Sequence, residues 1–343
     1  MEDGGGSVDA ALPCQRDEDG GCLPIQYAFT TSFPRAVDHH GTFIHDAPDA
    51  GAFLYVTGGI LTRNAQATGA VYPFFTRARI GGDGFLGEWE ELDPLPAPTA
   101  FHALTQHNGR VYMLAGLTQS GGQPSASRRT WVGTPDGLGN FAWVQGPQLP
   151  AKVRTHATAH VLGGKLHLVG GGNAAGTTLV TVAEVMTDGT LGAFADGAPL
   201  PRARSHHGAV EHQGRVYLVG GFDEDQAAVD VVHRSIPAAD GSIAGWEVAG
   251  VLENPPWTPS VILVDNRIYV LGGGAGSDNL ATVRVAPIQE DGMVGTFERL
   301  PNMPFARSHV HQAPVMGRRF YSVGGRSGRT FDSTDDVLTG VIR

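Results

Sequence analysis

Short apolar runs that end in a pair of small residues recur along the chain. Their first small residues stand at positions 58, 115, 170, 220, 272 and 324, which are 50 to 57 residues apart. The six runs are Phe53–Gly59, Val111–Gly116, Leu166–Gly171, Val216–Gly221, Ile268–Gly273 and Phe320–Gly325. No helical stripe of convincing length accompanies them, so the pattern predicts strands in a repeat architecture rather than a helical solenoid.

A second series keeps the same period. Asp-Gly pairs begin at Asp83, Asp136, Asp188, Asp240 and Asp291, and an aromatic residue follows each of them: Trp89, Trp143, Phe194, Trp246 and Phe297. Asp-Gly between β-prone runs predicts a hairpin, because a tight primed turn needs positive φ. Each repeat is therefore expected to hold four antiparallel strands. The predicted fold is all-β, a six-bladed β-propeller of four-stranded blades.

The two ends of the chain predict how the ring closes. The sixth repeat stops at Arg343 after its third strand, and the segment PIQYAFTTSFP near the N-terminus supplies a fourth. Tyr27 precedes Pro34 by seven residues, as Trp89 precedes Pro96. We expect this N-terminal strand to complete the last blade and remove the open edges. Residues 24–343 then form one propeller, and residues 1–23 a flexible, acidic and Gly-rich tail.

These motifs resemble the kelch family. Its repeat has an Arg-x-x-His entry to the inner strand, as at Arg204 and His207, a Tyr-x-x-Gly-Gly second strand, as at Tyr217, and an aromatic fourth strand. The resemblance covers residues 24–343, and the repeated Asp-Gly hairpin is similar to a bacterial subgroup. It implies a six-bladed propeller and says little about function, because one propeller shape hosts many activities.

Charge and hydropathy limit the kinds of partner that the chain can bind. Acidic residues outnumber basic ones 34 to 24, giving a net charge of −10. Nucleic-acid binding depends on Lys and Arg that neutralise phosphates, so no nucleic-acid partner is expected. No apolar run approaches the roughly 18 residues that a membrane-spanning helix needs.

The N-terminal region indicates export. The only two cysteines, Cys14 and Cys22, lie close together there, which predicts a small disulfide in an oxidising compartment; a pair of free surface thiols is the alternative. The opening MEDGGGSVDAALP resembles the tether behind the lipidated cysteine of bacterial lipoproteins. We expect an extracytoplasmic protein, periplasmic, secreted or an outer-membrane lipoprotein whose full-length precursor carries a lipid anchor.

Twelve of the 14 histidines fall near the predicted inner strands. Counted from the proline that ends each fourth strand, the sixth position holds His40, His102, His156 and His207, which match the packing histidine of the kelch repeat. The fifth position faces the other way in a strand. It holds His39, Phe101, Thr155, His206, Thr258 and His309, of which Thr258 is placed from the glycine pair of its repeat.

The resemblance implies a ligand site at the fifth position. In kelch proteins that bind peptides, this position and nearby arginines line the mouth of the central channel. The predicted ligand-binding residues are therefore the six of the fifth position together with Arg154, Arg204 and Arg307. The alternative is a rim of solvated side chains.

His39, His206 and His309 could also bind a transition metal such as Zn²⁺, Cu²⁺ or Fe²⁺, since neutral imidazole is a common ligand. Blades six and one are neighbours, but blade four lies across the axis, which argues against this set.

Two functions follow from these expectations. The first is a binding module whose His/Arg-rich channel mouth receives a protein, peptide or carbohydrate. The second is an enzyme at the same mouth, either metal-assisted or similar to the kelch-type sialic-acid mutarotases, with Arg204 and Arg307 acting beside Asp38, Asp223 or Glu224. The copper chemistry of galactose oxidase is excluded, because it needs a cysteine cross-linked to tyrosine and both cysteines lie in the tail.

Overall fold

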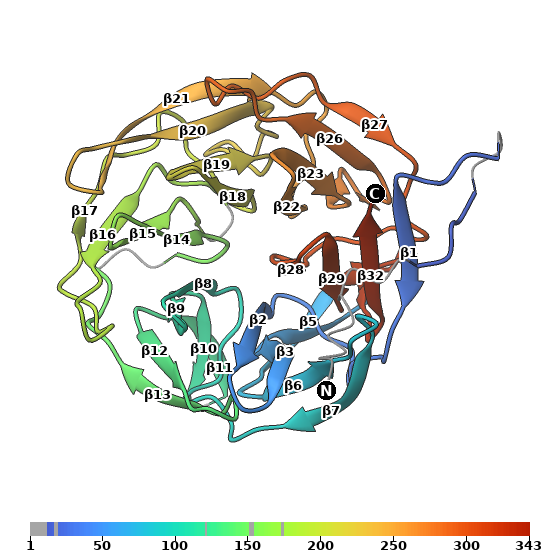
Figure 1. Cartoon of the computed structure of the whole chain (residues 1–343). Helices are drawn as coiled ribbons and strands as arrows, with labels where there is room; N and C mark the ends of the chain where they lie inside the picture. Colours follow the sequence, from blue (N-terminus) through green and yellow to red (C-terminus); the bar gives the residue numbers. More distant parts are fainter. Residues whose placement is uncertain (1–11, 17–19, 121, 151–153, 173–174) are drawn as a thin grey trace, which may run out of the picture.

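A computed structural model of the chain consists of six four-stranded antiparallel sheets around a central axis (Figure 1). It describes residues 12–16, 20–120, 122–150, 154–172 and 175–343. Within these ranges the backbone forms strands, bridges and turns, and none of it is a helix that could cross a membrane. The predicted all-β, six-bladed propeller is confirmed.

The innermost strand of each blade lies nearest the axis, and the strands of each blade are named in order from the axis outwards. Blade one holds β2 (Gly41–Ala47), β3 (Gly51–Thr57), β6 (Phe75–Ile80) and β7 (Leu86–Glu91); blade two holds β8 (Ala103–His107), β9 (Arg110–Leu114), β12 (Thr130–Pro135) and β13 (Phe141–Gln145). Blade three holds β14 (Thr158–Leu162), β15 (Lys165–Val169), β16 (Val180–Glu184) and β17 (Ala195–Asp196); blade four holds β18 (Gly208–His212), β19 (Arg215–Val219), β20 (Val231–Pro237) and β21 (Ile243–Val251). Blade five holds β22 (Ser260–Val264), β23 (Arg267–Leu271), β26 (Val283–Pro287) and β27 (Glu298–Leu300).

Blade six combines the two ends of the chain. It holds β28 (Val315–Met316), β29 (Arg319–Val323), β32 (Val337–Ile342) and, outermost, β1 (Ile25–Phe29). β1 pairs antiparallel with β32, from Ile25 opposite Ile342 to Phe29 opposite Leu338. The N-terminal strand therefore closes the ring as predicted, and it covers the edge of β32.

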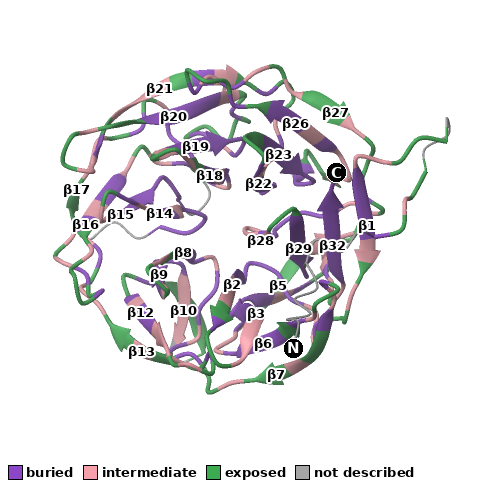
Figure 2. Ribbon diagram, in the orientation of Figure 1, coloured by how far each residue is buried: buried purple, intermediate pink, exposed green. Residues whose placement is uncertain are grey.

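Apolar residues of neighbouring blades pack against each other, and the inner and middle strands carry most of the buried surface (Figure 2). A tyrosine of the second strand adds a polar link between blades. Tyr112 donates to the turn carbonyl of Gly189 in the next blade over 3.0 Å, and Tyr55, Tyr217 and Tyr321 make the same kind of bond. Blade three has the buried His167 at this position.

The Asp-Gly turns are longer than the predicted primed turns. In blade one, Gly84 donates to the Gly81 carbonyl and Gly81 to the Phe85 carbonyl, both over 2.8 Å. Gly84 alone of residues 81–85 has positive φ, at 78°, while the Asp83 carboxylate accepts the Phe85 amide over 3.0 Å. A turn with one left-handed glycine thus forms the hairpin, and the aspartate caps it.

The connections between second and third strands gather at one end of the propeller, which we call the loop end. Four of them are small hairpins: β4 (Ile60–Arg63) with β5 (Gln66–Val71), β10 (Leu117–Ser120) with β11 (Gln123–Ala126), β24 (Gly274–Ala275) with β25 (Asp278–Asn279), and β30 (Arg326–Ser327) with β31 (Asp332–Ser333).

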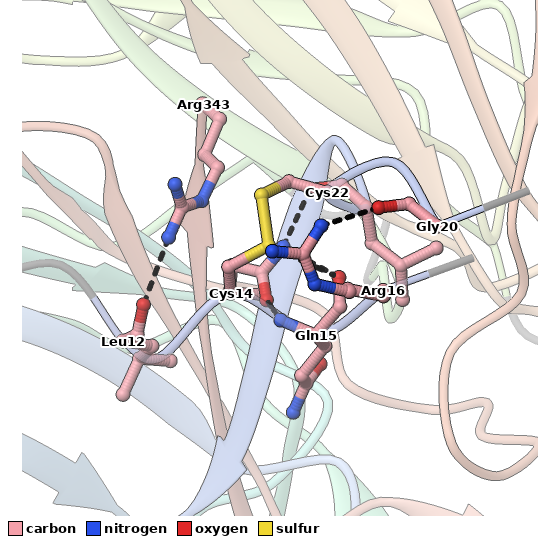
Figure 3. The surroundings of a disulfide bond; sticks show 9 residues. Leu12, Cys14, Gln15, Arg16, Gly20, Cys22 and Arg343 are labelled. Atoms are coloured by element: carbon pink, nitrogen blue, oxygen red, sulfur yellow. Dashed lines mark hydrogen bonds between the residues drawn. A yellow bond between two sulfur atoms is a disulfide. The ribbon is translucent and has the colours of Figure 1, made fainter.

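The segment before β1 rests against blade six (Figure 3). Cys14 and Cys22 form a disulfide with their Cα atoms 5.4 Å apart. The side-chain amide of Gln15 donates to the Tyr27 carbonyl over 2.6 Å. Arg343 donates to the Leu12 carbonyl over 2.9 Å (Figure 3). Of residues 12–16 and 20–23 of the expected tail, Leu12 is buried and most of the others are exposed. Residues 1–11 and 17–19 of that tail lie outside the described residues.

Candidate functional site

One left-handed residue from each blade surrounds the axis at the entry to the inner strand. We call these six residues the axial ring, and their φ values lie between 45° and 59°: His39, Phe101, His156, His206, Thr258 and His309. Non-glycine residues rarely adopt this conformation, and such positions concentrate at functional sites. Its occurrence once in every blade shows that the fold imposes it at this position.

Hydrogen bonds between neighbouring blades connect the axial ring. The Phe101 amide donates to the His39 carbonyl over 2.9 Å, and the Thr258 amide donates to the His206 carbonyl over 2.8 Å. The His39 amide reaches the His309 carbonyl over 3.4 Å and so joins the first blade to the last. The left-handed turn aims each amide at the preceding blade, so the ring acts as a belt around the axis.

The ring contains five of the six residues expected at the fifth position, with one correction. His156 takes the place predicted for Thr155, because blade three has one more residue between its proline and the ring than the other blades with that proline. Thr155 lies one residue earlier and donates its hydroxyl proton to the Gly172 carbonyl over 2.6 Å.

The ring is not an open channel mouth. His39, Thr258 and His309 are buried, and imidazoles of neighbouring blades contact one another, with 4.6 Å between the His39 and His309 ring centroids and 3.5 Å between those of His156 and His206. Left-handed backbone turns the side chains towards the axis, where they fill the lumen at this level.

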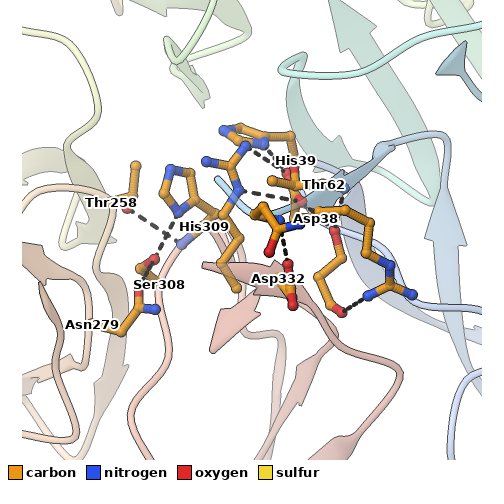
Figure 4. Close-up of polar contacts among 12 residues, drawn as sticks. Asp38, His39, Thr62, Thr258, Asn279, Ser308, His309 and Asp332 are labelled. Carbon is orange, nitrogen blue, oxygen red and sulfur yellow. Dashed lines mark hydrogen bonds and ion pairs between the residues drawn. The ribbon is translucent and has the colours of Figure 1, made fainter. Parts of the chain in front are cut away.

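An oxygen on the preceding residue holds Nδ1 of every ring histidine. Asp38 binds His39, Thr155 binds His156 at 2.9 Å, Ser205 binds His206 at 3.0 Å, and Ser308 binds His309 at 2.7 Å. Figure 4 shows the His39 and His309 arrangements. The repeated pair of an oxygen-bearing residue followed by histidine is visible in the sequence, and it is the signal that could have located His156.

Two of these contacts fix the imidazole tautomer. The Ser308 hydroxyl donates its only proton to Asn279 Oδ1, and the Thr155 hydroxyl donates its proton to Gly172. Each hydroxyl can then only accept from its histidine, so Nδ1 carries the proton in His309 and His156. The Asp38 carboxylate imposes the same tautomer on His39. Nε2 of these three rings is left as a lone-pair acceptor.

Burial keeps the axial imidazoles neutral. Desolvation lowers the pKa of His39, His156 and His309 well below the usual 6.5, and neighbouring charges such as other histidines lower it further. Desolvation also lowers the pKa of His206, to about 3. Removing an imidazolium from water is costly, so protonation is disfavoured at neutral pH.

Asp38 is buried beside the ring and has several partners. Its carboxylate accepts from His39 Nδ1, from the Ser333 hydroxyl over 2.5 Å and from Arg326 Nη2 over 3.3 Å. The Asp38 carboxylate therefore orients His39 (Figure 4). It also pairs with Arg326. Among the described residues, the arginine that pairs with Asp38 is Arg326, and not Arg204 or Arg307 as a mutarotase-like pair would require.

The three arginines predicted at the channel mouth lie elsewhere, which is a second correction. Arg154, Arg204 and Arg307 are at most 3% exposed and turn away from the axis into their own blades. Arg204 Nη1 donates to the Leu218 carbonyl over 3.1 Å, and Arg307 Nη1 donates to the Ser322 carbonyl over 3.0 Å. Burial lowers the pKa of Arg204 to about 9. These side chains bind backbone carbonyls of the strands, so they stabilise the blades.

The histidines of the sixth position pack between blades. His102 Nε2 hydrogen-bonds Thr57 Oγ1 at 3.0 Å, and His207 Nε2 hydrogen-bonds Thr158 Oγ1 at 3.1 Å. Each bond joins a histidine to the neighbouring blade, in line with the packing role that the kelch resemblance implies.

A cavity of about 490 Å³ occupies the channel below the axial ring. The inner strands and the segment before β28 line it, with His102, His160, His207, Glu211, His311 and Gln312 among its walls. Pro314 has no backbone N–H to donate to the sheet. The inner strand of blade six consists only of Val315–Met316. The irregular segment before it places His311 within 5.1 Å of His39 and 5.4 Å of His156, measured between ring centroids.

The structure groups other histidines than the metal ligands predicted from the sequence, which is the third correction. Among the described residues, one group of three side chains brings metal-ligating atoms within 4.8 Å of one another, and it consists of His39, His156 and His311. His206 and His309 are outside it, since His206 stacks on His156 and His309 lies edge-on to His39. The sequence placed His311 beside the structural column and gave no reason to aim it at the axis.

A depression of about 810 Å³ lies at the loop end, between blades four and five. Phe222 and Trp257 line it, and Arg202 and Asp230 lie at its sides. Trp257 stacks between Phe222 and Phe331 at centroid distances of 5.9 and 6.1 Å, and it contacts His309 at 5.2 Å. Sequence reasoning missed both aromatics, because each belongs to a loop and follows no repeat.

Fold and site together define a closed six-bladed β-propeller with histidines packed along its axis. A sequence profile described as Kelch motif matches residues 203–234, which include β18 and β19 and end in β20. The solved structure of YjhT superposes with a TM-score of 0.69 at 11% identity, covering 91% of this chain and 97% of that one. The chain is a six-bladed β-propeller that contains a kelch motif and is similar to kelch-repeat proteins.

Curated relatives agree with this assignment. Kelch-like protein 41a of Danio rerio is 21% identical over 226 residues, which is 66% of this chain and 35% of that protein. Kelch-like protein 38 of Homo sapiens is 28% identical over 254 residues, 73% of this chain and 40% of that protein. Beta-scruin of Limulus polyphemus is 23% identical over 225 residues, 60% and 24% of the two chains. The matched region is thus about a quarter to two fifths of the length of these relatives.

Proposed function

We propose that this propeller is a binding module that receives a segment of a partner protein at its loop end. A kelch propeller suggests a protein-interaction module, and the described residues offer the aromatic depression between blades four and five as the place of contact. The observation that carries the proposal is the pre-positioned, half-buried indole of Trp257 in the wall of that depression.

Packing holds Trp257 in place before any ligand arrives. Its backbone pairs with Gly274, with an N–H to carbonyl distance of 3.0 Å. A Cβ at Gly274 would lie 2.2 Å from the indole, so the glycine is needed for the ring to lie flat there. Tryptophan is enriched among the residues that dominate binding energy, and a side chain already ordered loses little entropy on binding.

Charge around the depression suits a polar peptide backbone with an apolar anchor. The exposed Asp230 and the half-exposed Arg202, which pairs with Asp223 over 2.5 Å, offer one acceptor and one donor beside the aromatics. A peptide side chain packed on Trp257 would leave its flanking amides and carbonyls near these groups. Carbohydrate also stacks on aromatic rings, and the experiment below includes it as a competing outcome.

We propose in addition that the module acts outside the cytoplasm. The disulfide between Cys14 and Cys22 supports an oxidising compartment, where such bonds persist. A lipid anchor on the full-length precursor would hold the propeller at a membrane surface.

A random peptide library selected on the immobilised protein tests the binding proposal. We expect enriched peptides to share an apolar or aromatic residue and to bind Trp257→Ala at least about tenfold more weakly, as loss of a hot-spot residue predicts. Phe222→Ala serves as a second variant of the same site. Val144→Ala, on the exposed face of β13, is the matched control and should leave affinity unchanged.

Selected peptides that bind Trp257→Ala and Phe222→Ala as tightly as the parent protein would contradict the proposal. A glycan array that shows binding while the peptide library yields none would replace it with a carbohydrate-binding function.

A further inference from the structure

We propose that His39, His156 and His311 form a binding site for one divalent transition-metal ion, for which Zn²⁺ is the natural probe. The three side chains come from blade one, blade three and the irregular segment of blade six, and their ligand atoms lie within 4.8 Å of one another. This site is separate from the loop-end depression, so it does not depend on the proposed binding function.

The available lone pairs point to a cation. Nδ1 of His39 and of His156 is occupied by Asp38 and Thr155, which leaves Nε2 of each as the metal-facing atom. Nε2 of His156 and Nε2 of His311 are buried and meet no hydrogen-bond partner among the described residues. Buried polar atoms normally have a partner, and a metal ion would satisfy several such acceptors at once.

The distances require only a small closure of the site. Zn²⁺ binds imidazole nitrogen at about 2.0–2.1 Å in tetrahedral geometry. A triangle of nitrogens up to 4.8 Å apart reaches that geometry if each ring moves inwards by less than about 1 Å. Rotation of the rings about their side-chain bonds supplies this, while the backbone belt of the axial ring stays intact.

Asp38 provides the oriented support that metal-bound histidines commonly have. Its buried carboxylate accepts from His39 Nδ1 and is itself held by Ser333 and Arg326. A carboxylate behind the imidazole fixes the tautomer and raises the basicity of the ligating nitrogen. Because Arg326 already neutralises Asp38, the ion would be bound mainly by the three neutral imidazoles.

Three histidines leave one coordination position for another ligand. His311 belongs to the metal-ligating group and also lines the 490 Å³ channel cavity, so the remaining position is reached from that cavity. Sites with three protein ligands and one exchangeable position are the kind that bind water or a small ligand on the ion.

Titration of metal-free protein with Zn²⁺ and with Co²⁺ tests the site. We expect one ion per chain, and for Co²⁺ the visible absorption of a low-coordinate centre with nitrogen ligands. His156→Asn and His311→Gln should weaken binding at least tenfold. Asparagine is used at the ring because it tolerates the φ of 54°, whereas His311 is outside the ring and its variant does not disturb that backbone.

Two matched comparisons separate this set from the neighbouring histidines. His206→Asn, also in the ring with a φ of 56°, should keep the stoichiometry and affinity. Asp38→Asn should weaken binding about 10–100-fold, while Ser205→Ala, which removes the corresponding contact to His206, should not. Less than stoichiometric binding by the folded parent protein, or equal affinity in the folded His156→Asn and His311→Gln variants, would overturn the proposal.

Discussion

Nδ1–H of His156 donates a hydrogen bond to the hydroxyl of Thr155, 2.9 Å away, and that hydroxyl donates a hydrogen bond to the carbonyl of Gly172. This short chain of bonds fixes where the lone pair of the ring lies. The same principle acts at His39 through Asp38 and at His309 through Ser308. The axis of this propeller is therefore an ordered cluster of neutral imidazoles, held by residues that precede them in the sequence.

The belt of backbone bonds predicts a stability effect at Thr258. The His309 amide donates to Thr258 Oγ1 over 3.3 Å, where the other ring contacts use a carbonyl. Thr258→Val keeps the shape but leaves this buried amide without its acceptor, so we expect a loss of about 1–3 kcal/mol of unfolding free energy. Urea unfolding measures it.

Thr76→Val is the matched control for that variant. The Thr76 hydroxyl is buried and has no hydrogen-bond partner among the described residues, so its removal should be neutral or stabilising. Equal losses at both threonines would show that the contact to His309 contributes nothing.

His167 predicts a stabilising substitution. It occupies the place where Tyr112 and Tyr217 donate to a turn carbonyl of the next blade, and it is buried with neither ring nitrogen hydrogen-bonded in the described structure. His167→Tyr should reach the Asp240-Gly241 turn and gain about 0.5–1.5 kcal/mol. The reverse change, Tyr112→His, should destabilise. A decrease in melting temperature for His167→Tyr would contradict the proposed link between blades.

The buried histidines predict acid sensitivity. Burial lowers the pKa of His40, His102 and His206 to about 3 and that of His167 and His311 to about 4. The unfolded chain binds protons near pH 6.5 while the folded chain does not, so stability is complete above pH 6.5 and falls as the pH falls towards 4. Each such histidine contributes roughly 1.4 kcal/mol per pH unit below 6.5.

Unfolding free energies of metal-free protein between pH 7.5 and 4.5 measure this slope. His167→Tyr should reduce the slope by the contribution of one histidine, roughly 1.4 kcal/mol per pH unit. A stability that is flat down to pH 5 would be incompatible with neutral imidazoles at the axis.

Closure by β1 predicts a difference between two truncations. Removal of residues 1–29 exposes the edge of β32, and exposed edges promote association between chains. Removal of residues 1–11 leaves β1 and the disulfide in place. Size-exclusion chromatography should show oligomers or aggregates for the first variant and an unchanged profile for the second.

Repeats in the sequence predicted the architecture because every blade needs the same strand lengths, turns and packing residues. The Gly-Gly runs, the Asp-Gly turns and the register from Tyr27 to Pro34 each describe a feature that recurs, and β1 lies where that register places it. The side chains of the ring at His39, Phe101, His206, Thr258 and His309 were found by the same counting.

Departures from the repeat could not be predicted in this way. One additional residue in blade three moves His156 into the ring, and the irregular segment before Val315 brings His311 to the axis. The prediction that the arginines line the channel mouth was wrong for another reason. A guanidinium at Arg204 can satisfy strand carbonyls or face a ligand, and only the fold shows that it binds Leu218 and Gly220. Phe222 and Trp257 meet through loops whose lengths follow no pattern.

Nε2 of His39, His156 and His309 is an unprotonated acceptor, because Nδ1 of each ring carries the proton. Proton–nitrogen correlation spectra of imidazole-¹⁵N-labelled, metal-free protein at pH 7 measure the tautomers directly, with His39→Asn, His156→Asn and His309→Asn for assignment. We predict the Nδ1–H form for all three rings. Nε2–H tautomers, or charged imidazolium rings at this pH, would contradict this arrangement of the axial histidines.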